Sequence, residues 1–127
     1  MKTPLSPTVG VVIVNWNSGL LLARCLDALA RQTAPPARIL VVDNASSDGS
    51  ERAATERAGV ELLSMAENLG FAEANNIGVE YLDDCDWVAL LNPDAFAEPQ
   101  WLAALSAQAG KDPEVPSFAS RQLLADA

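Results

Sequence analysis

Histidine is absent from this chain of 127 residues, and cysteine occurs only twice, as Cys25 and Cys85. Without histidine, Ser-His-Asp catalysis, Cys-His catalysis and zinc sites built on imidazole are excluded. Two cysteines are too few for a cysteine-rich metal site or a disulfide scaffold. We therefore interpret both as small, buried hydrophobic residues.

Basic residues are also scarce: 8 lysines and arginines stand against 17 aspartates and glutamates, which gives a formal net charge of −9 at pH 7. Binding to a nucleic-acid backbone depends on a positively charged surface, so we expect no nucleic-acid partner. A small phosphate-bearing ligand is still compatible with this charge, provided that a bound cation supplies the missing positive charge.

Long hydrophobic runs are missing as well. The longest candidate, Val9 to Val14, falls far short of the roughly 18 residues that span a bilayer. It is also too short for the apolar region of an export signal. We therefore expect a cytoplasmic location, with the inner face of the membrane as the alternative.

Short apolar runs alternate with amphipathic stretches four times along the chain. The expected strands are 9–14, 38–42, 60–65 and 87–91, and the expected helices are 21–29, 48–58, 71–81 and 99–109. Such alternation produces parallel strands joined by right-handed crossovers. The sequence therefore predicts an α/β fold of Rossmann-like, three-layer α/β/α type with a mainly parallel sheet over residues 9–127. Residues 1–8 are expected to form a flexible arm, and a short strand is expected near Ser117 to Ser120.

Local residues predict where two of the helices begin. Asn17 or Ser18 is placed to cap the first helix. Asp48, with Glu51 three residues later, has the capping-box pattern for the second helix, which we expect to end at about Ala58.

Two further groups have structural interpretations. We interpret Trp16 and Trp87 as packing residues. The acidic side chains before the fourth strand predict a solvated turn, and they are Glu80, Asp83, Asp84 and Asp86.

Polar residues gather where the predicted strands end. The first strand is followed by Asn15–Asn17, the second by Asp43–Gly49 and the fourth by Asn92–Asp94. The third helix carries Asn75 and also Gly78, which costs roughly 1 kcal/mol relative to alanine, and such costs are expected at functional sites. Each cluster alone is also typical of an ordinary turn or cap. Because ligands bind at the carboxyl ends of parallel strands, their convergence on one sheet edge favours a binding site.

Asp43 and Asp94 are the two acids expected at this edge. A carboxylate after the second strand can accept hydrogen bonds from a base N–H or a ribose hydroxyl. A carboxylate in the turn after the fourth strand can hold a hard divalent cation, which takes oxygen ligands and substrate phosphates. The chain has no Walker loop and no G-x-G-x-x-G motif, so a metal that bridges a diphosphate is the expected mode of phosphate binding.

Four motifs together resemble family-2 glycosyltransferases of the GT-A fold, and rhamnosyltransferases in particular. They are VVIVNWN at 11–17, VDNASSDGS at 42–50, NLGFA with NNIG at 68–78, and LLNPD at 90–94. The resemblance covers about residues 9 to 125 and implies the nucleotide-sugar-binding half of an inverting enzyme. It also implies a dTDP-, UDP- or GDP-sugar donor, a divalent cation (Mg²⁺ or Mn²⁺), and a saccharide or lipid-linked acceptor.

The resemblance assigns roles to individual residues. Asp43 matches the acid that binds the base or ribose, and Asp94 matches the metal-binding acid of the D-x-D motif. Asn92 stands where the first aspartate of that motif would be, which removes one carboxylate. The remaining matches are donor contacts on the first strand and positions near the nucleotide and phosphates, namely Asn15, Asn17, Gly70 and Asn75.

A second departure lies in the acceptor region. Family members supply an acidic general base from a segment that nothing after Asp94 resembles, so the catalytic base is unknown, and we expect little transfer by this chain alone. The alternative is a degenerate fold without chemistry: a nucleotide-binding module would bind without turnover, and an interaction protein would not bind nucleotide. An exposed sheet edge also predicts homo-oligomers.

Overall fold

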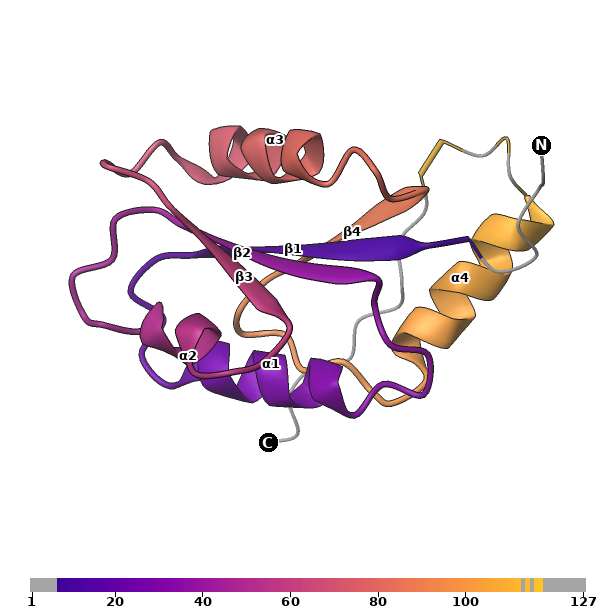
Figure 1. Ribbon diagram of the computed structural model, residues 1–127, viewed down its shortest axis with the longest axis horizontal. Helices are drawn as coiled ribbons and strands as arrows, with labels where there is room; N and C mark the ends of the chain where they lie inside the picture. Colours follow the sequence, from indigo (N-terminus) through magenta and orange to yellow (C-terminus); the bar gives the residue numbers. More distant parts are fainter. Residues whose placement is uncertain (1–6, 113, 115, 118–127) are drawn as a thin grey trace.

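Four parallel strands form one sheet, as the sequence predicts. The computed structural model describes residues 7–112, 114, 116 and 117 (Figure 1). The strands are β1 (Val9–Asn15), β2 (Arg38–Asp43), β3 (Val60–Ser64) and β4 (Trp87–Leu91), in the order β3-β2-β1-β4. The helices are α1 (Leu21–Ala30), α2 (Arg52–Thr55), α3 (Phe71–Tyr81) and α4 (Trp101–Lys111).

The helices cover both faces of the sheet, which gives the predicted three layers. Val11 and Ile13 of β1 pack in one core with α1, α2 and α4, while Val12 and Val14 pack in a second core with α3. Figure 1 shows α3 on one side of the sheet and α1 and α2 on the other. Every residue of β1 is buried because this strand lies in the middle of the sheet, with β2 and β4 on either side.

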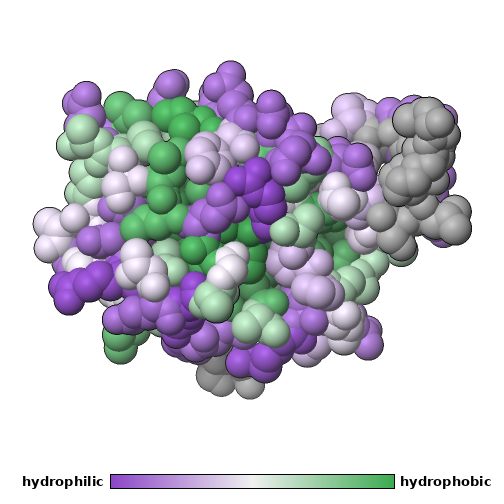
Figure 2. All heavy atoms as spheres, in the orientation of Figure 1, coloured by the Kyte–Doolittle hydropathy of each residue, from purple (hydrophilic) through white to green (hydrophobic). Residues whose placement is uncertain are grey.

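The edge strand β3 is less covered. Its first four residues are only half-buried, and Figure 2 shows hydrophobic residues among hydrophilic ones across the middle of the face on which β3 lies in front. Glu61 on this strand binds Arg38 of β2 at 2.7 Å. Among the described helices, none is both long enough and apolar enough to cross a bilayer.

Gly78 has a packing reason for its place in α3. A Cβ there would lie 2.6 Å from Cγ1 of Val12, so only glycine lets the helix lie this close to the sheet. The cost in helix propensity therefore results from helix–sheet packing, and the functional explanation suggested by the sequence is not needed.

The predicted cap of the first helix is wrong. Leu20 occupies the N-cap position of α1, and no side chain caps the helix. The side chains of Asn17 and Ser18 are engaged elsewhere: Ser18 Oγ donates to the Asn15 side chain, and Asn17 Oδ1 accepts from backbone N–H groups of the segment after β2.

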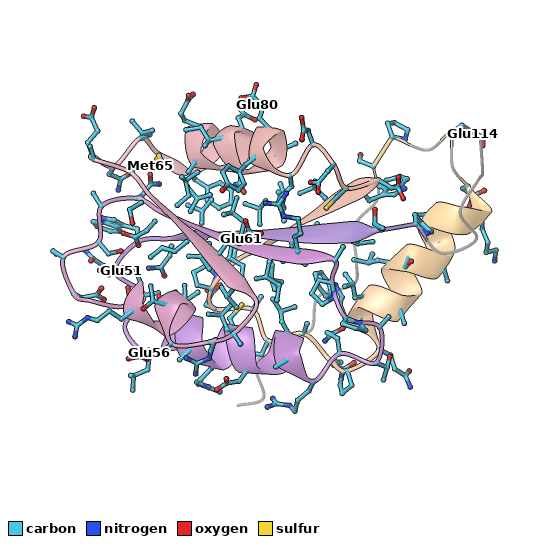
Figure 3. All side chains as sticks on the ribbon, in the orientation of Figure 1. Glu51, Glu56, Glu61, Met65, Glu80 and Glu114 are labelled. Atoms are coloured by element: carbon cyan, nitrogen blue, oxygen red, sulfur yellow. The ribbon has the colours of Figure 1, made fainter. Side chains whose placement is uncertain are left out.

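The predicted capping box is also wrong, and α2 ends at Thr55, before Ala58. Asp48 accepts hydrogen bonds from the backbone N–H groups of Ser50 and Gly19, both at 2.9 Å. Glu51 itself occupies the N-cap position of α2, where Figure 3 shows its side chain, and its Oε1 atom is buried without a hydrogen-bond partner among the described residues. Asp48 thus links two loops where the local pattern predicts a helix cap.

The other boundaries agree closely with prediction. α3 and β4 have the predicted bounds, and β3 ends one residue earlier than expected, at Ser64. α4 begins two residues later than expected, at Trp101, and the side chain of Gln32, just after α1, accepts a hydrogen bond from Leu102 N in its first turn.

The two ends of the chain are described only in part. Pro7 is buried, and Thr8 exchanges hydrogen bonds with Asp86, so these two residues of the predicted arm are held against the sheet. The rest of that arm and residues 118–120 of the strand predicted near the C-terminus lie outside the described residues.

The acidic side chains before β4 are exposed, as predicted, and Figure 3 shows Glu80 pointing away from the sheet. Two of these acids also have partners, since Asp84 binds Arg38 and Asp86 binds Thr8. The turn is therefore solvated but is also tied to the rest of the fold.

Candidate functional site

A cleft of about 520 Å³ lies at the carboxyl edge of the sheet. Segments that follow all four strands contribute to it, and its lining residues are Val14, Trp16, Leu21, Asn44, Asn68, Gly70, Phe71, Asn92, Pro93 and Asp94. The strand order reverses between β1 and β4, since the chain proceeds from β1 to β2 and β3 on one side and returns to β4 on the other. This is the place where open parallel sheets bind ligands.

Three of the predicted site residues line the cleft: Gly70, Asn92 and Asp94. Asn92 and Asp94 are exposed. The Asn92 main-chain oxygen accepts a hydrogen bond from Ala95 N at 3.0 Å, which closes a tight turn. The Asp94 carboxylate therefore stands on a short turn at the end of β4 with open access to a ligand.

Helix α1 holds this turn from behind. The thiol of Cys25 lies 3.6 Å from the main-chain oxygen of Asn92, and the guanidinium of Arg24 lies 4.3 Å from the ring centroid of Phe96. Burial, together with the negative charge of Asp94, raises the pKa of the Cys25 thiol to about 12. Cys25 is thus a neutral, buried packing residue, as predicted, and Cys85 is half-buried.

Asp43 and Asn15, by contrast, do not line the cleft. They lie opposite each other on β2 and β1, and both are almost fully buried, with exposed fractions of 3% and 0%. Asn15 Nδ2 donates to Asp43 Oδ1 and to Ser50 Oγ, each at 2.9 Å. Asp43 also accepts hydrogen bonds from Ser46 Oγ at 2.7 Å and from Ser46 N at 2.9 Å. These two predicted site residues form a buried polar pair beside the cleft.

Asn17 connects the loop after β1 to the loop after β2. Its φ angle is +48°, an uncommon value for a residue with a side chain. Its backbone N–H donates to Ser46 Oγ at 2.9 Å, and its Oδ1 accepts from Ser47 N at 2.8 Å. Asp48 adds a further link to Gly19, and hydrogen bonds from Ser50 hold the pKa of its carboxyl below the usual range. Asn17 is therefore a loop connector that does not line the cleft.

Asn44 is a cleft residue that sequence reasoning missed. Its Oδ1 accepts from Leu69 N at 3.2 Å, and its Nδ2 donates to the Gly70 oxygen at 3.1 Å. Gly70 has a φ of +89°, and nothing lies within 4 Å of where its Cβ would be, so this backbone can be approached closely by a ligand. Asn44 itself is only 2% exposed, so its side chain supports this backbone from within the fold. The available signal was its position directly after Asp43 in the polar segment that follows β2.

Trp16 is also a cleft residue, and its interpretation as a packing residue is wrong. Its side chain is 55% exposed and lines the cleft, together with Leu21 and Phe71. Trp87 does pack against the core on the α1 side of the sheet, as predicted. Asn75 is 7% exposed and does not line the cleft, and its side chain makes no hydrogen bond within the described part of the chain.

The cleft residues fit a cation only when a bound ligand supplies further oxygen atoms. Within the described residues, no group of three or more histidine, cysteine, aspartate or glutamate side chains comes together. Asp94 provides one carboxylate and Asn92 one amide oxygen. Mg²⁺ commonly takes one or two carboxylates and completes its shell with phosphate oxygens and water, so these residues fit a metal–nucleotide complex better than a metal alone.

A model of the family described as glycosyl transferase family 2 matches residues 10–122. The chain belongs to glycosyl transferase family 2. It is 32% identical over 120 residues to an N-acetylglucosaminyl-diphospho-decaprenol L-rhamnosyltransferase of Mycobacterium tuberculosis, which covers 86% of this chain and 39% of the relative. It is 34% identical over 106 residues to the glycosyltransferase AglE of Haloferax volcanii, which covers 79% of this chain and 34% of that protein. This family-2 chain thus spans about two fifths or less of the length of these curated relatives.

Solved structures show that this family-2 chain has the GT-A fold. A mannosyltransferase from Pyrobaculum calidifontis, in complex with GDP-Man and Mn²⁺, superposes with a TM-score of 0.73 at 25% identity, covering 86% of this chain and 33% of that one. TarS of S. aureus, in complex with UDP-GlcNAc, superposes with a TM-score of 0.77 at 17% identity, covering 91% of this chain and 37% of that one. The second likeness concerns the fold alone.

Proposed function

We propose that this family-2 chain binds the nucleoside diphosphate of a dTDP-, UDP- or GDP-linked sugar in the cleft at the carboxyl edge of the sheet. The observation that carries the proposal is the exposed Asp94 in that cleft, which the open backbone of Gly70 also lines and which lies at the strand-order reversal. The mannosyltransferase with GDP-Man and Mn²⁺ supports both the donor class and the cation.

The complete protein is proposed to be an inverting glycosyltransferase that transfers the sugar to a saccharide or lipid-linked acceptor. The decaprenol in the name of the M. tuberculosis relative supports a lipid-linked acceptor, and with it a cytoplasmic reaction at the inner face of the membrane. The base that deprotonates the acceptor is not assigned to any residue of this chain, and we expect little transfer by the chain alone.

The cleft residues have different roles in donor binding. Asp94 would hold Mg²⁺ or Mn²⁺, with Asn92 as a neutral neighbour. When bound, this cation supplies Lewis-acid stabilisation of the departing nucleoside diphosphate. The apolar side chains of Leu21, Phe71 and Trp16 exclude water from the bound donor, and Gly70 allows its close approach to the backbone.

Titration calorimetry with dTDP, UDP and GDP, each with and without Mn²⁺, tests this proposal. We expect at least one nucleotide to bind in a cation-dependent manner and Asp94→Ala to abolish that dependence. Asp83→Ala is the matched control, since Asp83 is exposed, does not line the cleft and lies at the end of β4 opposite to Asp94.

The titration and an activity assay together distinguish a transferase from an interaction protein and from a non-catalytic nucleotide-binding module. Absence of binding by the wild-type chain would leave an interaction protein as the remaining explanation. Nucleotide binding by a full-length protein that neither transfers nor hydrolyses any donor would indicate a non-catalytic module. Unchanged binding in Asp94→Ala would remove the metal role of this residue.

A further inference from the structure

The carboxylate of Asp43 is already occupied by hydrogen bonds within the chain. Three donors reach it: Asn15 Nδ2, Ser46 Oγ and Ser46 N, at 2.9, 2.7 and 2.9 Å. With 3% of its surface exposed and no part in the cleft lining, it offers no open oxygen to a base or a ribose. The role that the family resemblance assigns to Asp43 therefore does not fit this geometry.

The same carboxylate fixes the chain on both sides of Trp16. On one side, it binds the side chain of Asn15 directly. On the other side, it accepts from Ser46 Oγ, and that hydroxyl oxygen in turn accepts the backbone N–H of Asn17 at 2.9 Å. The positive φ of Asn17 shows that this segment is held in a conformation that a residue with a side chain seldom adopts. Trp16, between these two anchors, is left exposed in the cleft.

We infer that Asp43 is a positioning residue, which acts through Asn15 and Ser46 to hold Trp16 as a wall of the cleft and does not touch the donor. The inference deepens the proposed function, because it rests on the donor lying in this cleft. It assigns to Asp43 a contribution to affinity that is the same for every nucleotide, whatever its base.

Substitution of Asp43 would remove hydrogen bonds that link it to Asn15 and Ser46. Asp43→Asn replaces one acceptor oxygen with an N–H₂ group. In the Oδ2 position this group cannot accept from Ser46 N, and in the Oδ1 position it cannot accept from Asn15 Nδ2 or Ser46 Oγ. A buried donor left without its acceptor is costly, so Trp16 loses an anchor even where the chain stays folded. A base-reading residue would behave differently, since its loss would change the affinities for pyrimidine and guanine nucleotides unequally.

The experiment measures the affinities for dTDP, UDP and GDP in the presence of Mn²⁺, for the wild type, Asp43→Asn and Ser46→Ala. We expect affinity to fall by about tenfold for each nucleotide that the wild type binds, so that the ratios among them stay constant. Ser47→Ala is the matched control, because its hydroxyl makes no hydrogen bond within the described residues, and we expect wild-type affinities for it.

A second readout follows the tryptophan itself. In ¹⁵N-labelled protein, the indole N–H signal of Trp16, assigned with Trp16→Phe, should shift in Asp43→Asn and in Ser46→Ala. The signals of Trp87 and Trp101 should keep their positions. A general loss of stability would instead change all three tryptophan signals. If Asp43→Asn does not fold, Ser46→Ala carries both readouts, since it removes only one hydroxyl.

The outcomes are distinct. A changed ratio among the nucleotides in Asp43→Asn, or an unchanged Trp16 signal in both variants, overturns the positioning role. Failure of the wild type to bind any nucleotide overturns the proposed function instead, and the Trp16 signal of the unliganded protein then still decides whether Asp43 positions it.

Discussion

The thiol of Cys25 lies 3.6 Å from the main-chain oxygen of Asn92, so helix α1 supports the turn that presents Asp94 to the cleft. A second link, Gln32 Nε2 to the oxygen of Glu98 at 2.7 Å, holds the chain that leads away from this turn. The proposed metal-binding carboxylate therefore stands on a turn whose position is set by a neighbouring helix. Four predictions follow from this geometry and from the packing of the sheet.

Metal binding should depend on nucleotide. Among the residues that the structure describes, Asp94 is the one carboxylate in the cleft lining, so we expect the protein alone to leave the electron paramagnetic resonance signal of free Mn²⁺ unchanged. Asn92→Asp restores the carboxylate missing from the D-x-D pattern and should tighten Mn²⁺ binding in the nucleotide complex by about tenfold. Asn92→Ala serves as the control. Equal Mn²⁺ affinity of the wild type and Asn92→Asp would contradict this account.

The buried thiol of Cys25 should make stability fall at alkaline pH. Its pKa is 9.0 when unperturbed and about 12 in the folded chain, so the folded state holds the proton more tightly than the unfolded state. The stabilisation is complete below pH 9.0 and is lost as pH rises towards 12. Urea unfolding on both sides of pH 9.0 should show a shallower decline for Cys25→Ala than for the wild type. Burial also raises the pKa of the half-buried Cys85 thiol, so Cys85→Ala should flatten the decline as well, and the double variant should flatten it most. Equal slopes for the wild type and Cys25→Ala would refute the prediction.

Gly78→Ala should destabilise the fold. The new Cβ would meet Val12 Cγ1 at 2.6 Å, and overpacking of this kind costs about 1–3 kcal/mol. The gain in helix propensity of about 1 kcal/mol offsets only part of that cost. Thermal and urea unfolding provide the measurement, with the exposed Asn76→Ala on the same helix as the control, which should be neutral or slightly stabilising. A Gly78→Ala variant as stable as the wild type would show that α3 can move away from the sheet.

The edge strand β4 should promote self-association of the chain. No strand pairs with its outer side among the residues that the structure describes, and Leu90 on this strand is 52% exposed. Unpaired edges are templates for pairing with another chain, and charged side chains discourage it. Light scattering over a range of concentrations should therefore show dimers in the wild type and monomers in Leu90→Lys. A wild type that stays monomeric at the highest concentration would count against the prediction.

The local sequence predicted secondary structure correctly where a residue's neighbours along the chain determine whether it is helical or extended. The bounds of α3 and β4 were predicted residue for residue because their apolar periodicity and flanking polar residues lie within the segment itself. The helix caps were missed for the opposite reason. Asn17 and Asp48 are ordinary capping residues by type, yet each accepts a hydrogen bond from a loop about 30 positions away.

The sequence by itself determined the parallel sheet and the edge at which polar residues collect, because alternating strands and helices place every strand's carboxyl end on the same side. Only the tertiary structure decided which of those residues face the ligand. Asp43 ends β2 and Asp94 follows β4, but Asp43 is 3% exposed and bonded to Asn15, whereas Asp94 is exposed and lines the cleft. Whether a carboxylate is an open ligand or a buried support depends on the donors that reach it, and for Asp43 one of these, Asn15 Nδ2, comes from a different strand.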